Sequence, residues 1–216
     1  MITSYTKYTT LPNMITLSRV FLIPFFLVFS YKGLTSDFPA IYFAINIALL
    51  VFVLIRVTDF LDGWIARLTN SVTPLGSYLD VWTDFLFVLC SYIMLNFLNI
   101  IPFWLTALAI YKFFEFLILS EIIKKHLAIC GAKSDVVLYY DIPGRIASTF
   151  FYSLPCLILV FNLLLIDIGT FSILYYGLLL ITVFSSAIKF FNVKHMINKE
   201  NNCHEMPNDT SCKEIL

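Results

Sequence analysis

Six long apolar stretches dominate this sequence and limit what it can fold into. Each is close to the roughly 20 residues that an α-helix needs to cross a bilayer. A transmembrane β-barrel would instead alternate in polarity over segments of about ten residues, a pattern that does not appear. The sequence therefore predicts an all-α integral membrane protein with six transmembrane helices. The stretches are drawn at Ile15–Tyr31, Pro39–Val57, Tyr78–Leu98, Pro102–Ile123, Ile146–Ile166 and Ile168–Phe190.

Composition and charge agree with a membrane location. The 216 residues are 60% hydrophobic and 13% charged, whereas soluble domains average about 45–50% apolar and 25% charged residues. A formal net charge of zero gives no indication of a nucleic-acid partner. Basic residues cluster in alternate loops, and the three other loops hold only Lys32, so we expect both termini in the cytoplasm. We expect a membrane domain over residues 1–195 and a disordered polar cytoplasmic tail over residues 196–216.

The junction between the second and third apolar stretches carries the unusual charge. Residues 59–84 read DFLDGWIARLTNSVTPLGSYLDVWTD. Asp59 and Asp62 share one helix face, and Asp80 and Asp84 recur on one face of the next helix. Thr73 followed by a proline predicts the N-cap of that helix. Antiparallel packing of the two helices is expected to bring the two carboxylate pairs face to face.

A divalent metal site is the interpretation that these charges favour. Carboxylates in a membrane helix are costly unless they are paired or bound to a cation, and Arg67 is the one basic residue in the stretch. An all-oxygen site suits Mg²⁺ or Mn²⁺, and four carboxylates are enough to bridge two ions. Arg67 could also hold a phosphate, with Gly63, Ala66 and Gly76 leaving room for it. A proton or ion pathway uses intramembrane carboxylates too, and small residues at helix contacts are often only packing.

Eight of these positions form the pattern D-x-x-D-G-x-x-A-R-x8-G-x-x-x-D-x-x-x-D. The pattern resembles the signature of the CDP-alcohol phosphatidyltransferase family. This resemblance implies a membrane enzyme of phospholipid biosynthesis that transfers a phosphatidyl group from CDP-diacylglycerol to an alcohol and releases CMP. It also implies a cytoplasm-facing active-site cavity, a homodimer and a location in the bacterial cell membrane. By the resemblance, the metal ligands are Asp59, Asp62, Asp80 and Asp84, the general base is Asp84, and the CDP-lipid contacts are Gly63, Ala66, Arg67, Thr73 and Gly76.

The alcohol acceptor is less well defined by the sequence. The opening LPNMITLSR followed by FLIPFFLVF is similar to that of bacterial phosphatidylglycerophosphate synthases, which favours glycerol 3-phosphate. Lys112 and Arg145 are the candidate ligands of the acceptor, although Lys112 could instead form a packing ion pair with Glu115 and Arg145 an interfacial anchor. Many members of that group have cations where this chain has Phe85 and Phe114. Serine, an inositol phosphate or a lipid alcohol therefore remain alternative acceptors, and a non-catalytic or ion-translocating membrane protein is the alternative from another class.

Overall fold

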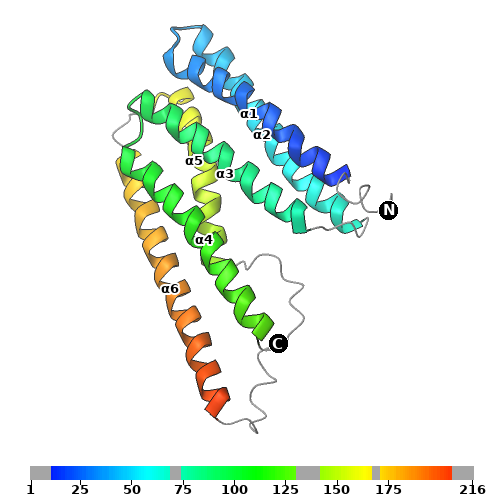
Figure 1. Ribbon diagram of the computed structural model, residues 1–216. Helices are drawn as coiled ribbons and strands as arrows, with labels where there is room; N and C mark the ends of the chain where they lie inside the picture. Colours follow the sequence, from blue (N-terminus) through cyan, green and yellow to red (C-terminus); the bar gives the residue numbers. More distant parts are fainter. Residues whose placement is uncertain (1–10, 69–73, 130–141, 167–170, 206–216) are drawn as a thin grey trace.

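The computed structural model describes residues 11–68, 74–129, 142–166 and 171–205, and within these ranges it leaves out some side chains near helix ends, including those of Ala66 and Arg67. All regular secondary structure in these ranges is helical, and each of the six helices is long and apolar enough to cross a membrane. The predicted all-α architecture is thus confirmed (Figure 1). The helices are α1 (Leu11–Thr35), α2 (Ala40–Leu68), α3 (Pro74–Phe97), α4 (Phe103–Ile129), α5 (Ile142–Leu163) and α6 (Phe171–Glu205).

Several helices extend beyond the apolar stretches. α1 begins at Leu11, so Pro12 lies in its first turn, where a missing N–H costs no helical hydrogen bond. α3 begins at Pro74, as the sequence predicted, and Thr73 lies outside the described residues. α6 continues to Glu205, so residues 196–205 of the predicted disordered tail are helical, which fits the helix-forming lysine and glutamate residues there. Residues 206–216 lie outside the described ranges, and the domain boundary at residue 195 stays a prediction.

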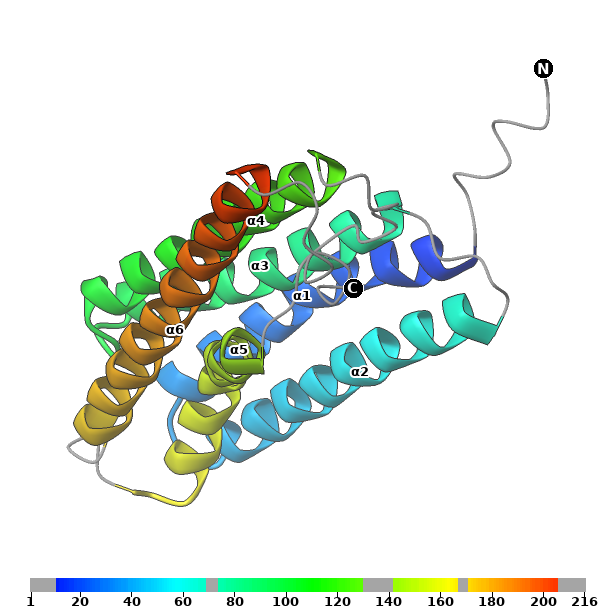
Figure 2. The same ribbon diagram turned by 90° about the horizontal axis from the view of Figure 1, so that it is seen from below.

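The helices are arranged around α1 and α5. α1 and α2 form a long antiparallel pair, and α1 also packs against α3 (Figure 1). α5 contacts each of the other five helices, and Figure 2 shows it between α2 and α6. α2 and α3 have little direct contact. The expectation that these two helices pack directly against each other is therefore wrong, because α1 bridges them.

An aromatic cluster joins four of the helices at the centre of the bundle. Each ring contacts at least two of the others, and the four are Phe26 of α1, Phe52 of α2, Phe87 of α3 and Tyr152 of α5. The Phe26 and Phe87 ring centroids are 5.0 Å apart, and those of Phe87 and Tyr152 are 4.6 Å apart. Rings at such separations attract each other in addition to burying apolar area. The cluster therefore ties α1, α2, α3 and α5 together.

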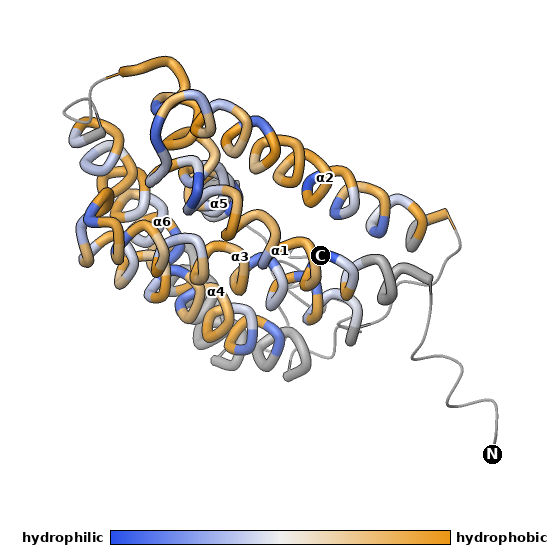
Figure 3. The backbone as a smooth tube through the Cα atoms, turned by 90° about the horizontal axis from the view of Figure 1, so that it is seen from above, coloured by the Kyte–Doolittle hydropathy of each residue, from blue (hydrophilic) through white to orange (hydrophobic). Residues whose placement is uncertain are grey.

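The outer surface of the bundle is also apolar. Orange, hydrophobic segments run along the helices in Figure 3. Large side chains such as Phe21, Phe43 and Phe184 are mostly exposed. A soluble monomer rarely exposes so much contiguous apolar surface, whereas lipid tails solvate it. The exposed surface thus agrees with six membrane-spanning helices.

Two helical glycines provide a test of the close packing between α1 and α2. A Cβ added at Gly33 would lie 2.7 Å from Cγ1 of Ile45, whereas one at Gly177 meets nothing within 4 Å. Ile45 is fully buried, so it has little room to move. We expect Gly33→Ala to lower the free energy of unfolding by about 1–2 kcal/mol through overpacking. Gly177→Ala, the matched control, should be neutral or stabilising because alanine favours helix. Thermal unfolding in detergent measures both, and equal stability of the two variants would contradict the described α1–α2 packing.

Candidate active site

One buried guanidinium holds all four aspartates of the sequence pattern. Arg19 of α1 reaches the carboxylates from α2 and α3 through its two terminal nitrogens. Nη1 lies 2.8 Å from Asp59 and 3.2 Å from Asp84, and Nη2 lies 2.6 Å from Asp62 and 2.5 Å from Asp80. The terminal nitrogens of a guanidinium carry four N–H donors, so the cation has one donor for each carboxylate. The carboxylate pairs do meet, as predicted, but they meet around a residue of a third helix.

The cluster is asymmetric in its burial. The Arg19 side chain is only 1% exposed, and Asp62 beside it is also buried. Thr16, one turn before Arg19, donates a 2.7 Å hydrogen bond to the same Asp62 oxygen that Arg19 contacts. Asp80 and Asp84 are more than one-third exposed. Arg19 therefore binds the carboxylates from the inner side of the bundle and leaves the outer sides of Asp80 and Asp84 accessible.

The local cations do not neutralise the cluster. Besides Arg19, Arg56 forms a 3.3 Å ion pair with Asp59. Two guanidiniums against four carboxylates leave the group anionic. Carboxylate oxygens of Asp59, Asp62 and Asp80 lie within 4.8 Å of one another. This all-oxygen, anionic donor set fits divalent cations such as Mg²⁺ or Mn²⁺, so the residues present match the group that the sequence implies.

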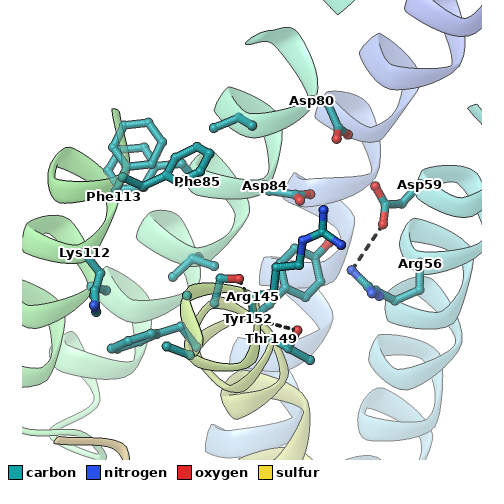
Figure 4. Close-up of a pocket in the computed structure, with 18 of the residues that line it drawn as sticks. Arg56, Asp59, Asp80, Asp84, Phe85, Lys112, Phe113, Arg145, Thr149 and Tyr152 are labelled. Atoms are coloured by element: carbon teal, nitrogen blue, oxygen red, sulfur yellow. Dashed lines mark hydrogen bonds and ion pairs between the residues drawn. The ribbon is translucent and has the colours of Figure 1, made fainter. Parts of the chain in front are cut away.

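A cavity of about 650 Å³ adjoins the carboxylates. Three of the four aspartates line it, whereas Arg19 and Asp62 are not among its described lining residues. Figure 4 shows Asp59, Asp80 and Asp84 on one side, and Lys112, Phe85 and Phe113 on the other. α2, α3, α4, α5 and α6 all contribute to its wall. Its size falls in the range of small-molecule sites, about 300–1,000 Å³.

Both candidate acceptor ligands, Lys112 and Arg145, line this cavity. The Lys112 ammonium is 2.9 Å from the carboxylate of Glu115, the partner that the sequence suggested. It also donates to Ser185 and Ser186 of α6, at 3.2 and 2.9 Å. The ion pair lies within α4, and the two hydrogen bonds join α4 to α6. These contacts are sufficient to hold the Lys112 side chain in place. Its contact with an acceptor stays a prediction.

Two further cations line the cavity, and the sequence analysis did not select either for the site. Arg56 lies over the ring of Tyr152, 4.7 Å from its centroid, while it pairs with Asp59. Lys189 of α6 is buried, with its ammonium 5.6 Å from the centre of the Phe116 ring. In the sequence both looked like positive residues at the cytoplasmic ends of helices. Lys189 is identified by its burial, and Arg56, whose side chain is 45% exposed, by its contacts with Asp59 and Tyr152; both belong to the cavity wall.

An aromatic stack includes Phe85, one of the two positions where the sequence lacked an expected cation. Phe85 of α3 and Phe113 of α4 lie parallel, with ring centroids 3.7 Å apart and an interplanar angle of 11°. Trp82 packs edge-on against both. Phe113 also contacts Phe114, the second position without its expected cation, with ring centroids 5.7 Å apart. Phe85 and Phe113 both line the cavity. They give one part of the cavity wall an apolar surface.

The predicted CDP-lipid contacts are only partly described. Gly63 and Gly76 are half-buried in α2 and α3, and neither is among the residues that line the cavity. The side chains of Ala66 and Arg67, and the whole of Thr73, lie outside the described residues. The 650 Å³ cavity is thus adjacent to the aspartates on the side of Lys112 and Arg145. The nucleotide-binding role of these five residues stays a prediction.

Comparison with known proteins agrees with the aspartate pattern. The sequence model of the CDP-alcohol phosphatidyltransferase family matches residues 9–187. The chain belongs to this family. A CDP-diacylglycerol–glycerol-3-phosphate 3-phosphatidyltransferase of Escherichia coli is 31% identical over 140 residues, which are 64% of this chain and 70% of that protein. A cardiolipin synthase (CMP-forming) of Streptomyces coelicolor is 32% identical over 124 residues, 56% of this chain and 54% of that protein.

A third relative, the CDP-diacylglycerol–glycerol-3-phosphate 3-phosphatidyltransferase of Bacillus subtilis, is 34% identical over 109 residues, 48% of this chain and 56% of that protein. The chain thus spans about half the length of the Streptomyces and Bacillus relatives. Family membership together with six apolar helices identifies a multi-pass membrane protein. The family uses divalent metal ions, in agreement with the aspartate cluster.

Removal of the central cation tests how the carboxylates are held together. We expect Arg19→Met to lower the free energy of unfolding by about 3 kcal/mol or more in chelator, because it leaves four carboxylates without their shared partner. Mn²⁺ should restore part of this loss, since it supplies positive charge to the same oxygens. Thermal unfolding with and without metal measures both effects. Lys32→Met, at an exposed position near the end of the same helix, is the control and should change little. If Arg19→Met in chelator were as stable as the wild type, the structural role of Arg19 would be contradicted.

Proposed function

We propose that this protein transfers the phosphatidyl group of CDP-diacylglycerol to the hydroxyl of an alcohol acceptor and releases CMP. The observation that carries the proposal is the convergence of Asp59, Asp62, Asp80 and Asp84, in the spacing of the family, at the edge of a cavity within the membrane domain. We further propose that the cavity and both termini face the cytoplasm of a bacterial cell, as the distribution of basic residues predicts. The lipid chains of the donor can then stay in the bilayer while its head group reaches the aspartates.

Asp84 is the proposed general base. It lines the cavity, and its contact to Arg19, at 3.2 Å, is the longest of the four. Its carboxylate takes the proton of the acceptor hydroxyl while the acceptor oxygen forms a bond to the phosphorus that carries diacylglycerol. The bond from that phosphorus to the CMP oxygen breaks, and CMP leaves with the electron pair. Positioned bases of this kind contribute typically 10²–10⁴-fold to a rate.

The aspartates have a second proposed role as ligands of Mg²⁺ or Mn²⁺. Asp59, Asp62, Asp80 and Asp84 would hold two such ions, which neutralise charge that develops on the diphosphate. Arg19 holds one oxygen of each carboxylate from the buried side. The carboxylates are therefore already gathered by the protein itself. This arrangement reduces the reorganisation that metal binding requires.

The enzymatic proposal is tested by CMP release from CDP-diacylglycerol with purified protein, metal and an acceptor panel. Asp84→Asn should reduce this release by at least about 100-fold, because the amide cannot accept the proton. Binding of CDP-diacylglycerol should be largely retained, since Asp59, Asp62 and Asp80 remain. If neither the wild type nor Asp84→Asn releases CMP with any acceptor, the proposed transferase activity is refuted. If Asp84→Asn releases CMP as fast as the wild type, the role of Asp84 as general base is refuted.

Glycerol 3-phosphate is the acceptor that the sequence and two relatives support. The Escherichia coli and Bacillus subtilis proteins are named as glycerol-3-phosphate phosphatidyltransferases. Four basic side chains line the cavity, namely Arg56, Lys112, Arg145 and Lys189. They give the cavity wall a positive character that suits a phosphate group. These side chains replace part of the positive charge that Phe85 and Phe114 do not provide.

A lipid alcohol is a second candidate acceptor, and the aromatic stack favours it. Phe85 and Phe113 line the cavity directly beside Asp84, so an acceptor with an apolar portion gains contact area there. The Streptomyces relative is named as a CMP-forming cardiolipin synthase. Cardiolipin carries two phosphatidyl groups on one glycerol, so transfer from CDP-diacylglycerol with CMP release yields it from phosphatidylglycerol. Both candidates present the same chemical group, a glycerol phosphate with a free hydroxyl.

Substitution at Phe85 separates the two acceptors. Phe85→Lys should raise the ratio of kcat/KM for glycerol 3-phosphate over phosphatidylglycerol by roughly 10-fold, because it adds a cation for the free phosphate and removes an apolar surface. Phe85→Leu at the same position is the control, since it removes the ring without adding charge. It should lower turnover of phosphatidylglycerol only. Acceptor ratios that are the same in wild type and both variants would mean that the aromatic stack does not select the acceptor.

A further inference from the structure

Among the described residues, three tyrosines are buried inside the bundle, and one of them differs in how its hydroxyl is used. Tyr92 donates a 3.1 Å hydrogen bond to the carbonyl oxygen of Phe151, and Tyr175 donates one of 3.0 Å to that of Ile100. Tyr152 is 7% exposed, and its hydroxyl has no hydrogen-bond partner in the described part of the chain. Buried polar groups are nearly always hydrogen-bonded. The exception therefore needs an explanation.

The Tyr152 ring is held on several sides. It stacks on Phe87 with an interplanar angle of 28° and packs against Phe52. The Arg56 guanidinium covers it at 4.7 Å. These contacts come from α2 and α3, while Tyr152 itself belongs to α5. The ring thus has little freedom to turn its hydroxyl toward another partner.

The position of this hydroxyl connects it with the proposed acceptor site. Tyr152 lines the same cavity as Asp84 and Arg145, and Figure 4 shows the three side chains together. Arg145, Thr149 and Tyr152 follow one face of α5 at intervals of four and three residues. The Thr149 hydroxyl is already engaged, because it donates to the Arg145 carbonyl at 2.8 Å. On this face, Tyr152 carries the hydroxyl that is left for a bound molecule.

We propose that the Tyr152 hydroxyl donates a hydrogen bond to a phosphate oxygen of the acceptor's glycerol phosphate group. Arg145 lies two turns earlier on the same face of α5. Together, Tyr152 and Arg145 hold the acceptor so that the free hydroxyl of the glycerol lies beside Asp84. The inference rests on the proposed transfer reaction and adds a residue that determines acceptor binding. It applies to glycerol 3-phosphate and to phosphatidylglycerol, because both carry this group. A hydrogen bond to a charged group would also satisfy the buried hydroxyl.

Tyr152→Phe removes a single oxygen and keeps the ring contacts. The full-length variant, purified in detergent with metal, should show a KM about 10-fold or more higher for the acceptor, with an unchanged KM for CDP-diacylglycerol. The assay has two arms, glycerol 3-phosphate and phosphatidylglycerol, and the arm with the larger rise identifies the acceptor source. The unfolding midpoint should be unchanged or higher, since no protein hydrogen bond is lost.

Tyr175→Phe is the matched control because it removes the same atom from a buried tyrosine outside the cavity lining. It loses the bond to Ile100, so its unfolding midpoint should fall while the acceptor KM stays at the wild-type value. A merely structural Tyr152 would behave like this control. Equal acceptor KM values for Tyr152→Phe and wild type in both arms would overturn the inference.

A binding measurement keeps the test independent of turnover. Glycerol 3-phosphate or short-chain phosphatidylglycerol should raise the unfolding midpoint of the wild-type protein and should raise that of Tyr152→Phe less. If the wild type releases no CMP, the transfer reaction fails, yet this shift still reports on Tyr152. If neither acceptor shifts the wild type, or if both proteins shift equally, the Tyr152 contact is refuted.

Discussion

The ion cluster around Arg19 is the interaction on which the rest of the structure depends. Four carboxylates from α2 and α3 converge on one guanidinium from α1, at distances between 2.5 and 3.2 Å. Without such a partner, carboxylates at this depth would repel one another and carry a large desolvation cost. The cation lets α2 and α3 present their aspartates to one site although they barely touch. The helix pairing of α1 with both neighbours is thus also the means by which the site is assembled.

The same helices are joined a few turns away by apolar contacts. Phe26 lies two turns after Arg19 on α1, and Phe87 lies one turn after Asp84 on α3. These rings, with Phe52 and Tyr152, form the aromatic cluster at the centre of the bundle. A charged cluster in low dielectric is strong only when its geometry is fixed. The adjacent aromatic packing supplies that rigidity, so fold and site stabilise each other.

Much of this could be predicted from the sequence, for identifiable reasons. The six helices follow from the length of the apolar stretches, and the four aspartates follow from their spacing on two helix faces. Arg19 could not be chosen, because an arginine near the start of an apolar helix looks like an interfacial anchor. Its role depends on α1 contacting both α2 and α3, a tertiary fact that local periodicity does not encode. For the same reason, the stacking of Phe85 on Phe113 could be found only in three dimensions.

The cavity combines three kinds of surface, and their order limits how substrates can lie in it. Aspartates from α2 and α3 form one side, basic residues contributed mainly by α4, α5 and α6 form another, and the Phe85–Phe113 stack lies between α3 and α4. A diphosphate with its metal ions is attracted to the aspartates, whereas a phosphate without metal is repelled there and attracted to the basic side. An acceptor that carries a phosphate is therefore oriented by charge before any specific contact forms. In the proposed reaction, the basic residues would hold its phosphate and its hydroxyl would reach Asp84. The charge distribution would thus give the proposed donor and acceptor different places within one cavity, as a direct transfer between them requires.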